Sequence, residues 1–341
     1  MTGASSAAVP AGATGILGVL VLYRPGADFG AVLARTLAEL PAVYLWDNTE
    51  SGDPSPVSEV LAACGTSDRA RIEYVRSSHN VGLPIAYNRA VQHARDRGDE
   101  FVLFLDQDSL IEPGTAARLR STLTALPDSL RPGALNARNL ERVVVGLSPK
   151  TALSKLWDSG YEQGYRTGRL YRAGAIRERW TLTNSGLFAR AATLAAVGGF
   201  NEELFLDAVD YAMAAQLRAA GYRLFEDTGA RIDHRQGSPA RWEAAGRSWT
   251  IRTYDARRSF HLVRDTTVAA ARMWARDPVL ATAISTSMWI GTAGAVALLP
   301  ERGSRIRMIL QGLSGSLRRS PPTPPNGSPP TTPSGPDGPS R

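Results

Sequence analysis

The sequence predicts an α/β fold, and three observations lead to that prediction. Strand and helix signals alternate from Ile16 to Asp128, the pattern of a parallel sheet with crossover helices. A short apolar run from Phe101 to Leu105 is typical of a strand buried on both faces. The length of 341 residues, with 43% hydrophobic content, suits one large α/β domain with appended segments.

Each element follows from its local pattern and from the turn residues that close it. The first strand ends at Arg24-Pro25-Gly26 and the second at Asp47-Asn48, both combinations that favour turns. The expected elements are, in order, a strand at Ile16–Tyr23, a helix at Phe29–Leu40, strands at Ala42–Trp46 and Ile72–Val75, a helix at Pro84–Arg97 and a strand at Phe101–Leu105.

The pattern changes beyond Pro132. The stretch from Pro132 to Gly174 is less regular, which suits a variable or acceptor-facing segment. Strand signals return over Trp180–Phe188, interrupted by Asn184-Ser185-Gly186, and a helix follows that ends at Val197-Gly198-Gly199.

Two carboxylates, Asp106 and Asp108, follow the buried strand directly. Open α/β sheets bind their ligands at the carboxyl ends of the strands, and carboxylate oxygens are hard ligands for a divalent cation. An isolated Asp-x-Asp is also found as a simple Asp-rich turn. The rest of the chain must therefore decide between a metal site and a turn.

A second carboxylate pair lies on a predicted helix from Asp207 to Ala220. Asp210, Met213 and Leu217 share one face by helical spacing, which places a carboxylate among apolar neighbours. Such a carboxylate usually faces a cleft or a cation. Asp207 lies three residues earlier on the same face, and a helix cap is its alternative role.

Composition limits the classes of partner. The net charge is +7, but the arginines are scattered and do not interleave with aromatic residues as a nucleic-acid groove requires. Nucleic acid is therefore not the expected partner, and an anionic membrane surface or a nucleotide diphosphate also fits the positive charge. The single cysteine, Cys64, excludes an intrachain disulfide and a cysteine-based metal site. A cytoplasmic protein is expected, and the N-terminus lacks the pattern of a secretory signal.

The segment Val279–Leu299 has no charged residue and is long enough to cross a bilayer. Its Ser, Thr and Gly residues weaken insertion, and arginines follow it from Arg302 onward. A membrane span, a helix on the membrane surface and a buried packing helix all remain open. The two ends of the chain, 1–14 and 320–341, are rich in small residues and proline and are expected to be disordered.

These residues suit transfer of a glycosyl group from a nucleotide sugar with inversion. That reaction needs a cation at the leaving diphosphate, a base for the acceptor hydroxyl and a nucleoside pocket. Asp106 and Asp108 suit the first requirement and a partly desolvated Asp210 the second. His234 offers an imidazole to the metal or diphosphate, with a purely structural histidine as the alternative.

The arrangement resembles the family 2 glycosyltransferases of the GT-A fold, and within them the rhamnosyltransferase-like branch, from about Ile16 to Asp265. The matching pieces occur in the order of that family. They are Val21-Leu22-Tyr23-Arg24-Pro25, Trp46-Asp47-Asn48-Thr49, Asn80-Val81-Gly82-Leu83-Pro84 with Asn88, Phe104-Leu105-Asp106-Gln107-Asp108-Ser109, Asn184-Ser185-Gly186, the segment from Gly199 to Asp210, and His234 to Gly237.

The resemblance implies a Rossmann-like mixed sheet flanked by helices over residues 15–265, with a helical extension over 266–319 that is a candidate for membrane association. It also implies roles for individual residues. These are nucleobase contact by Tyr23, Arg24 and Asp47, framing of the donor by Asn80 and Gly82, metal and diphosphate binding by Asp106 and Asp108, approach of Arg257 to the diphosphate, and base catalysis by Asp210 with Asp207 as competitor.

The implied cofactor is Mg²⁺ or Mn²⁺, the implied donor dTDP-rhamnose, and the expected acceptor a hydroxyl of a cell-envelope glycan or lipid-linked molecule at the inner face of the membrane. Two positions depart from the branch: Ala212 replaces a Glu beyond the catalytic Asp, and Arg258 replaces an Asn. The missing Glu leaves a noncatalytic glycan-assembly partner as an alternative. A nucleotidyltransferase is less favoured, because no Gly-rich phosphate loop follows the first strand.

Overall fold

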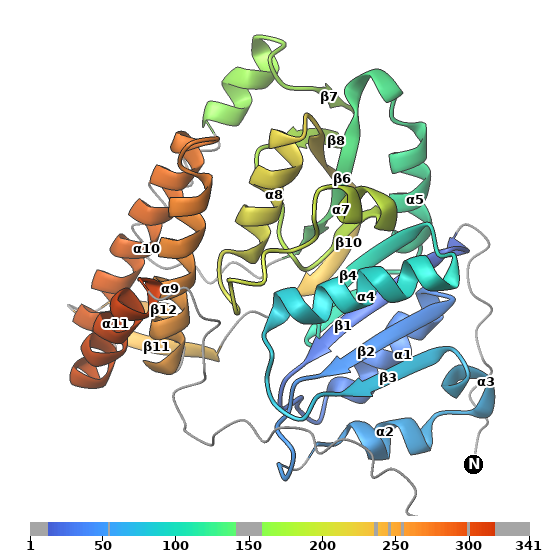
Figure 1. Cartoon of the computed structure of the whole chain (residues 1–341), viewed down its shortest axis with the longest axis horizontal. Coiled ribbons are helices and arrows are strands. Elements are labelled where there is room, and N and C mark those ends of the chain that lie inside the picture. The colour runs from blue at the N-terminus through green and yellow to red at the C-terminus, as the bar shows by residue number, and fades with distance from the viewer. Residues whose placement is uncertain are drawn as a thin grey trace, which may run out of the picture.

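The computed structural model describes residues 13–53, 55–140, 159–234, 238–244, 247–253, 256–298 and 301–317. A twisted sheet with helices on both faces forms the body, and the last three helices stack beside it (Figure 1). The tail expected at 320–341, and residues 1–12 of the tail expected at 1–14, lie outside the described residues.

The first half of the chain forms the parallel part of the sheet. Its strands lie in the order β3-β2-β1-β4, with all neighbours parallel. The elements are β1 (Ile16–Leu22), α1 (Phe29–Glu39), β2 (Ala42–Asp47), α2 (Val57–Ala63), α3 (Thr66–Arg69), β3 (Ile72–Arg76), α4 (Leu83–Arg97) and β4 (Phe101–Asp106). The strands and helices predicted here are confirmed within two residues at each end.

The second half adds antiparallel strands and makes the sheet mixed, in the order β4-β9-β6-β10-β8-β7, with β5 on β10. These elements are β5 (Ser109–Ile111), α5 (Thr115–Ala125), a 3-10 turn η2 (Asp128–Leu130), β6 (Pro132–Asn139), β7 (Arg172–Ala173), β8 (Ile176–Arg179), β9 (Leu187–Arg190), α7 (Ala191–Ala196), α8 (Val209–Ala219) and β10 (Arg223–His234). A separate hairpin pairs β11 (Ser238–Ala244) with β12 (Arg247–Thr253).

Two predictions for this half are wrong in part. The stretch from Pro132 to Gly174 was expected to be less regular, yet it begins with β6, an interior strand between β9 and β10. Residues 141–158 of that stretch lie outside the described residues. The strand expected over Trp180–Phe188 begins only at Leu187, as β9, because the backbone N–H of Trp180 donates to the Tyr161 hydroxyl and that of Thr183 to Asn136 Oδ1. Residues 180–186 connect β8 to β9 instead.

Apolar side chains alternate across the sheet and build a core on each face. In β1, Leu17, Val19 and Val21 join the cluster that packs against α4 and α8, while Ile16, Leu20 and Leu22 join the cluster under α1 and α5. Since all seven positions of β1 are buried, this strand is the centre of the domain.

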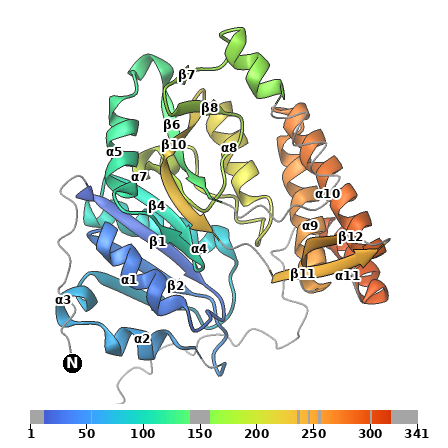
Figure 2. The ribbon, with the colours of Figure 1, turned by 180° about the vertical axis from the view of Figure 1, so that it is seen from behind.

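Three helices complete the described chain: α9 (Ala256–Met273), α10 (Pro278–Leu298) and α11 (Arg302–Ser316). Figures 1 and 2 place α10 and α11 on the outer side of α9, away from the sheet. Among the described residues one helix, at Pro278–Ala297, has the length and apolar composition to cross a membrane. The helical extension expected over residues 266–319 is present as these three helices. Its first helix begins ten residues earlier in the chain than expected, at Ala256.

Candidate active site

The candidate site lies where the parallel strands end. Leu22 is opposite Asp47 and Val21 is opposite Asp106, so the loops after β1, β2 and β4 leave the sheet at one edge. Strand order reverses direction between β1 and β4, the position at which open α/β sheets bind ligands.

The turn between β4 and β5 carries Asp106, Gln107 and Asp108. The Gln107 side chain ties this turn to the neighbouring loop, since its Oε1 accepts the Tyr23 N–H at 2.8 Å and its Nε2 donates to the Tyr23 carbonyl at 3.2 Å. Sequence reasoning treated Gln107 as a spacer between two carboxylates. The structure gives it the role of aligning the carboxylate turn with the end of β1.

His234 comes close to this turn in backbone register. Strand β5 pairs antiparallel with β10 so that Ser109 lies opposite His234, one residue beyond Asp108. The His234 side chain and residues 235–237 lie outside the described residues. The topology therefore brings the three residues predicted as metal ligands to one corner of the sheet.

A divalent cation fits this corner if protein carboxylates supply part of its coordination and the substrate supplies the rest. Carboxylates are its preferred protein ligands, and Asp106 and Asp108 supply two. Among the described side chains no group of three or more His, Cys, Asp or Glu residues converges as a metal cage. The fit is thus of the kind in which substrate phosphate oxygens and water complete the coordination, as is usual for Mg²⁺.

Asp210 lies in the first turn of α8 and is partly buried. Burial raises the pKa of its carboxyl to about 7, while the N–H of Tyr211, donating to Asp210 Oδ1 at 2.9 Å, acts in the opposite direction. The charges of Asp207 and Asp106 raise this pKa further. Burial and the charges of Asp106 and Asp210 also raise the pKa of Tyr87, so both carboxyls lie near one buried tyrosine ring.

Asp207 is not part of α8, which corrects the predicted helix start. The helix begins at Val209, and its N-cap position is Ala208, a left-handed residue with φ of 61° that makes no side-chain cap hydrogen bond. The cap role considered for Asp207 is therefore wrong. Asp207 instead accepts a hydrogen bond from Arg258 at 2.8 Å, and its side chain is only 12% exposed.

The turn that presents Asp207 is held by Asp265, a fully buried residue of α9. One carboxylate oxygen accepts the backbone N–H groups of Phe205, Leu206 and Asp207 at 3.1, 2.8 and 3.0 Å. Arg264 donates to the other oxygen at 2.8 Å. Sequence reasoning missed Asp265 and did not foresee the contact of Arg258, since both partners lie more than fifty residues from Asp207 in the chain.

Asn80 and Gly82 shape the loop that enters α4. Asn80 Oδ1 accepts the Gly82 N–H at 2.9 Å, and Asn48 holds the loop from the other side by donating to the Gly82 carbonyl at 3.1 Å. Gly82 has φ of 82° and touches the turn before α8, where Leu83 N–H donates to the Phe205 carbonyl at 2.7 Å. The loop predicted to frame the donor thus contacts the turn that carries Asp207.

Gly82→Ala is expected to destabilise the protein more than Gly98→Ala, which is a matched control. Both glycines have a positive φ, which costs a Cβ residue about 1–3 kcal/mol, and Gly82, with ψ of −178°, lies in a region that is almost restricted to glycine. A Cβ at Gly82 would lie 2.6 Å from the Phe205 carbonyl oxygen, whereas nothing lies within 4 Å at Gly98. Urea unfolding should show an additional loss of about 1–3 kcal/mol for Gly82→Ala, and equal losses in the two variants would disprove the contact.

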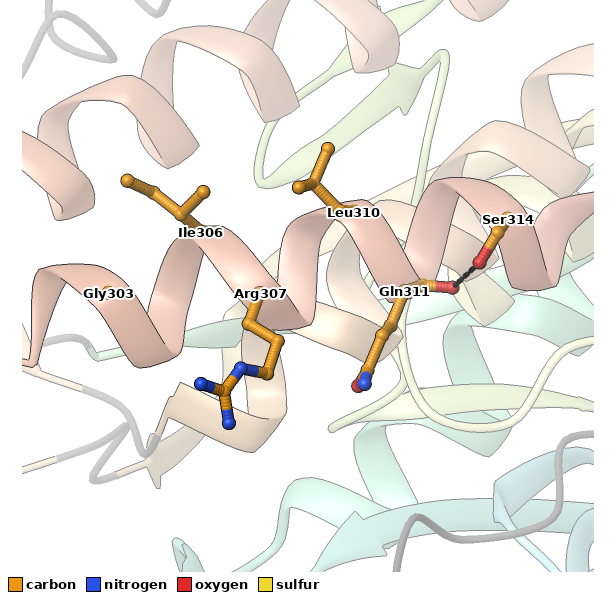
Figure 3. A pocket seen from close by; sticks show the side chains of 6 residues that line it. All are labelled: Gly303, Ile306, Arg307, Leu310, Gln311 and Ser314. Atoms are coloured by element: carbon orange, nitrogen blue, oxygen red, sulfur yellow. Dashed lines mark hydrogen bonds between the residues drawn. The ribbon is translucent and has the colours of Figure 1, made fainter.

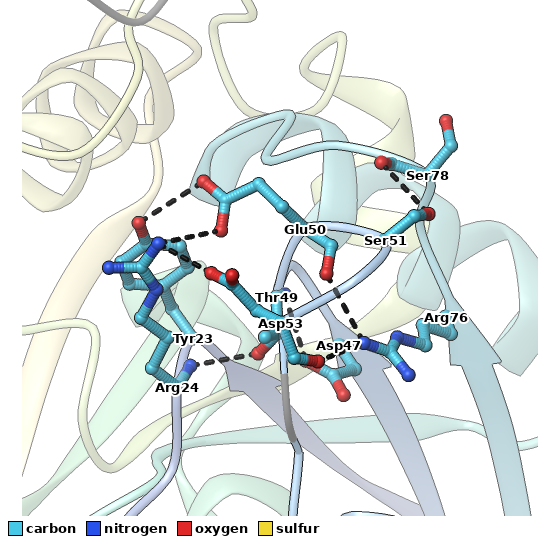
Figure 4. Close-up of polar contacts among 9 residues, drawn as sticks. All are labelled: Tyr23, Arg24, Asp47, Thr49, Glu50, Ser51, Asp53, Arg76 and Ser78. Carbon is cyan, nitrogen blue, oxygen red and sulfur yellow. Dashed lines mark hydrogen bonds and ion pairs between the residues drawn. The ribbon is translucent and has the colours of Figure 1, made fainter. Parts of the chain in front are cut away.

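The residues assigned to the nucleobase follow the ends of β1 and β2 (Figure 4). Asp47 is fully buried, and its carboxylate accepts from the Thr49 N–H at 2.9 Å, the Ser55 hydroxyl at 3.0 Å and the Tyr74 hydroxyl at 3.1 Å. Through these three hydrogen bonds Asp47 holds the loop after β2 in place.

Tyr23 and Arg24 are more accessible than Asp47. The Tyr23 hydroxyl donates to Glu50 at 3.2 Å, and the Arg24 side chain forms ion pairs with Glu50 and Asp53 (Figure 4). Glu50 and Asp53 were not among the predicted site residues. They place two carboxylates around the Arg24 guanidinium. Arg257, at the exposed start of α9, directly precedes the Arg258 that pairs with Asp207.

Residues 45–172 match the sequence model of glycosyl transferase family 2. No curated protein sequence matches the chain significantly. Solved structures with nucleotide-sugar ligands resemble it in fold.

Three of these structures are informative. GalNAc-T7 with UDP, GalNAc and Mn²⁺ has a TM-score of 0.51 at 12% identity over 77% of this chain, which spans only 50% of that protein. The mannosyltransferase PcManGT of Pyrobaculum calidifontis, with GDP-Man and Mn²⁺, has 0.51 at 15% identity over 89% of this chain and 86% of its own. TarS 1–349 of S. aureus, with UDP-GlcNAc, has 0.53 at 14% identity over 88% and 81%. These likenesses establish the mixed-sheet GT-A fold.

Proposed function

Residues 45–172 carry a glycosyl transferase family 2 region, and on this premise we propose that the chain is a metal-dependent, inverting glycosyltransferase. The observation that supports the proposal most is Asp210, a partly buried carboxyl with a pKa of about 7 close to the strand-end Asp106. A carboxylate with that basicity is suited to accept a proton near neutral pH. Structures with this fold contain nucleotide sugars and Mn²⁺, which is consistent with such chemistry.

In this mechanism Asp210 accepts the proton of the acceptor hydroxyl while the oxygen forms a bond to the anomeric carbon of the donor sugar. The bond from that carbon to the diphosphate breaks on the opposite face, and the nucleoside diphosphate leaves with the electron pair. Asp106 and Asp108 would hold a divalent cation, which supplies positive charge to the departing diphosphate. Asp207, fixed by Arg258 and by its backbone contact with Asp265, keeps the entrance to α8 in place beside the base.

The finer assignment rests on the motif resemblance. It makes dTDP-rhamnose the proposed donor and a cell-envelope glycan or lipid-linked hydroxyl the proposed acceptor. Tyr23, Arg24 and Asp47 are proposed at the nucleobase, Asn80 and Gly82 around the donor, Arg257 at the diphosphate, and His234 beside Asp108. The cytoplasmic side of the membrane is the compartment in which such an activity would meet its donor.

The test is a donor screen with the purified full chain. Release of nucleoside diphosphate is measured from dTDP-rhamnose and from a panel of UDP- and GDP-sugars, each with Mn²⁺, with Mg²⁺ and with EDTA. Cation-dependent release of dTDP, absent from an Asp210→Asn variant, is the expected result. Release from a UDP- or GDP-sugar alone would replace the donor assignment. Donor binding without turnover, even when candidate acceptors are added, would favour the noncatalytic alternative.

Arg258→Met is expected to lower transfer by about 10- to 100-fold and to move the acidic limb of the rate profile to higher pH. The negative charge of Asp207 raises the pKa of Asp210, and Arg258 partly offsets that charge by pairing with Asp207. Removal of Arg258 should therefore raise the pKa of Asp210 further. Arg258→Lys keeps a positive charge and should restore most of the rate. A profile that stays in place in Arg258→Met would show that Arg258 does not act through Asp207.

A further inference from the structure

Exposed apolar side chains gather on the helices at the end of the chain. The described part of the chain has eight large hydrophobic residues with high exposure, and six of them lie between residues 274 and 317. These six are Trp274, Val279, Trp289, Ile306, Leu310 and Leu317. The three highest exposed fractions are those of Leu317 at 86%, Val279 at 63% and Leu310 at 60%. Apolar side chains clustered in this way on a surface usually mark an interaction site.

Helix α10 has one buried and one exposed face. Leu280, Ala281 and Ile284 pack into the core next to α4 and α8, and Met288 is also buried. The exposed positions recur at helical spacing along the entire helix and none is charged. They are Val279, Thr282, Thr286, Trp289, Ala293 and Ala297. Only 28% of the apolar stretch within Pro278–Ala297 is buried, so α10 is more exposed than a core helix.

Helix α11 is fixed to α9 and turns a second apolar face outward. Gly312 makes the close contact, since a Cβ there would lie 2.7 Å from the Phe260 carbonyl oxygen. The opposite side of α11 lines an open depression of about 440 Å³ with Ile306 and Leu310 beside Arg307 (Figure 3). Both views place α10 and α11 at the outer rim of the molecule, away from the sheet (Figures 1 and 2).

Charge distinguishes the possible occupants of this surface. Residues 266–317 contain five arginines and two acidic residues, of which Asp277 is buried and bonded to Arg218 at 2.5 Å. The exposed cation Arg276 precedes α10, and Arg302 and Arg307 follow it, whereas Arg272 is paired with Glu203. A second copy of the chain would oppose arginines with arginines. Anionic lipid headgroups complement them, and tryptophans such as Trp274 and Trp289 favour the membrane interface.

We propose that the outer faces of α10 and α11 dock on an anionic lipid bilayer, with the two helices lying on the membrane. The uncharged stripe of α10 and the Ile306–Leu310 side of α11 enter the headgroup boundary, and the flanking arginines bind the lipid phosphates. Helix α9 then links this surface to the candidate site, because its first turn carries Arg257 and Arg258 and its last residue, Met273, directly precedes Trp274. This inference does not depend on the proposed sugar transfer, since lipid binding requires no turnover.

The test is co-sedimentation of the full chain with vesicles of phosphatidylcholine alone and of phosphatidylcholine with about one third phosphatidylglycerol. Binding to the anionic vesicles that weakens as salt is raised is expected, with much weaker binding to the neutral ones. Arg307→Gln should lower the partition coefficient by about fivefold, since each surface cation contributes about 1 kcal/mol. Arg169→Gln, at an exposed arginine between β6 and β7, is the matched control and should bind like the wild type.

Leu310→Glu tests the apolar part and should lower binding by about tenfold or more while leaving the melting temperature unchanged, because Leu310 is an exposed residue. Three results would overturn the proposal. One is no binding to anionic vesicles at low salt. Another is binding that persists in both Leu310→Glu and Arg307→Gln, which would place the contact elsewhere in the chain. The third is a dimer that Leu310→Glu dissociates, without lipid binding, which would make this face a contact between two copies.

Discussion

Asp210→Asn is expected to lower sugar transfer by about 10²–10⁴-fold and to stabilise the folded protein at the same time. The loss of rate follows from removal of the proposed general base. The asparagine keeps an oxygen that accepts the Tyr211 N–H, so the first turn of α8 is retained. Steady-state kinetics on the preferred donor, with donor affinity measured separately, separates loss of chemistry from loss of binding.

The stability effect has a defined sign and pH window. Burial raises the pKa of Asp210 from its usual value of 3.8 to about 7, so the folded state holds this proton more tightly than the unfolded state does. The cost of ionising Asp210 is absent below about pH 4, grows between pH 4 and 7, and is complete above pH 7. Asp210→Asn removes that cost and should stabilise the metal-free protein by about 2–4 kcal/mol at pH 8 and by little at pH 4.

The wild-type rate should also fall by about tenfold per pH unit once the pH is below the pKa of Asp210. In the protein loaded with a cation this pKa lies below the value of the free protein, because the cation offsets the charge of Asp106. Glu59→Gln, at an exposed carboxylate of α2, serves as the control and should change neither rate nor stability. A rate in Asp210→Asn within a few fold of wild type would remove Asp210 from the role of base.

Asp108→Asn and Asp106→Asn are each expected to lower transfer by about 10²–10³-fold and to raise the concentration of Mn²⁺ needed for half-maximal rate. A cation at a transferring phosphate contributes several kcal/mol to the transition state, and each 1.36 kcal/mol is a factor of ten in rate. EDTA should abolish the wild-type rate, and added Mn²⁺ should restore it. Metal titration of the rate in the three proteins is the measurement.

The two variants should differ in one respect. The charge of Asp106 raises the pKa of Asp210, so Asp106→Asn should move the acidic limb of the residual activity to lower pH. Asp108→Asn serves as the comparison for that shift. Undiminished activity in EDTA, or unchanged activity in both variants, would mean that these carboxylates are not metal ligands.

The parallel half of the fold could be predicted because its signals are local. Strands β1 and β4 are continuous apolar runs, and turn residues such as Pro25 and Gly82 lie close to the ends of their elements. Strand β6 has no such signal, since it begins with Pro132-Gly133 and contains Asn136 in its interior. It becomes an interior strand because β9 and β10 pair with it on either side.

The candidate site divides in the same way. Asp106, Asp108 and Asp210 could be identified because carboxylates directly after a buried strand or among apolar helix positions are unusual in sequence. Gln107, Arg258 and Asp265 could not be assigned their contacts, because their partners lie far away in the chain.

The charged residues at the ends of the strands can be identified from the chain alone, because an apolar run and the polar residue that ends it are adjacent in sequence. The basicity of Asp210, the first residue of α8 and the arginine that pairs with Asp207 depend instead on the folded arrangement. A pKa depends on burial and on charges a few ångströms away through space, and those charges come from β4, from the turn before α8 and from α9. Folding brings these segments together, and their chemistry exists only in that arrangement.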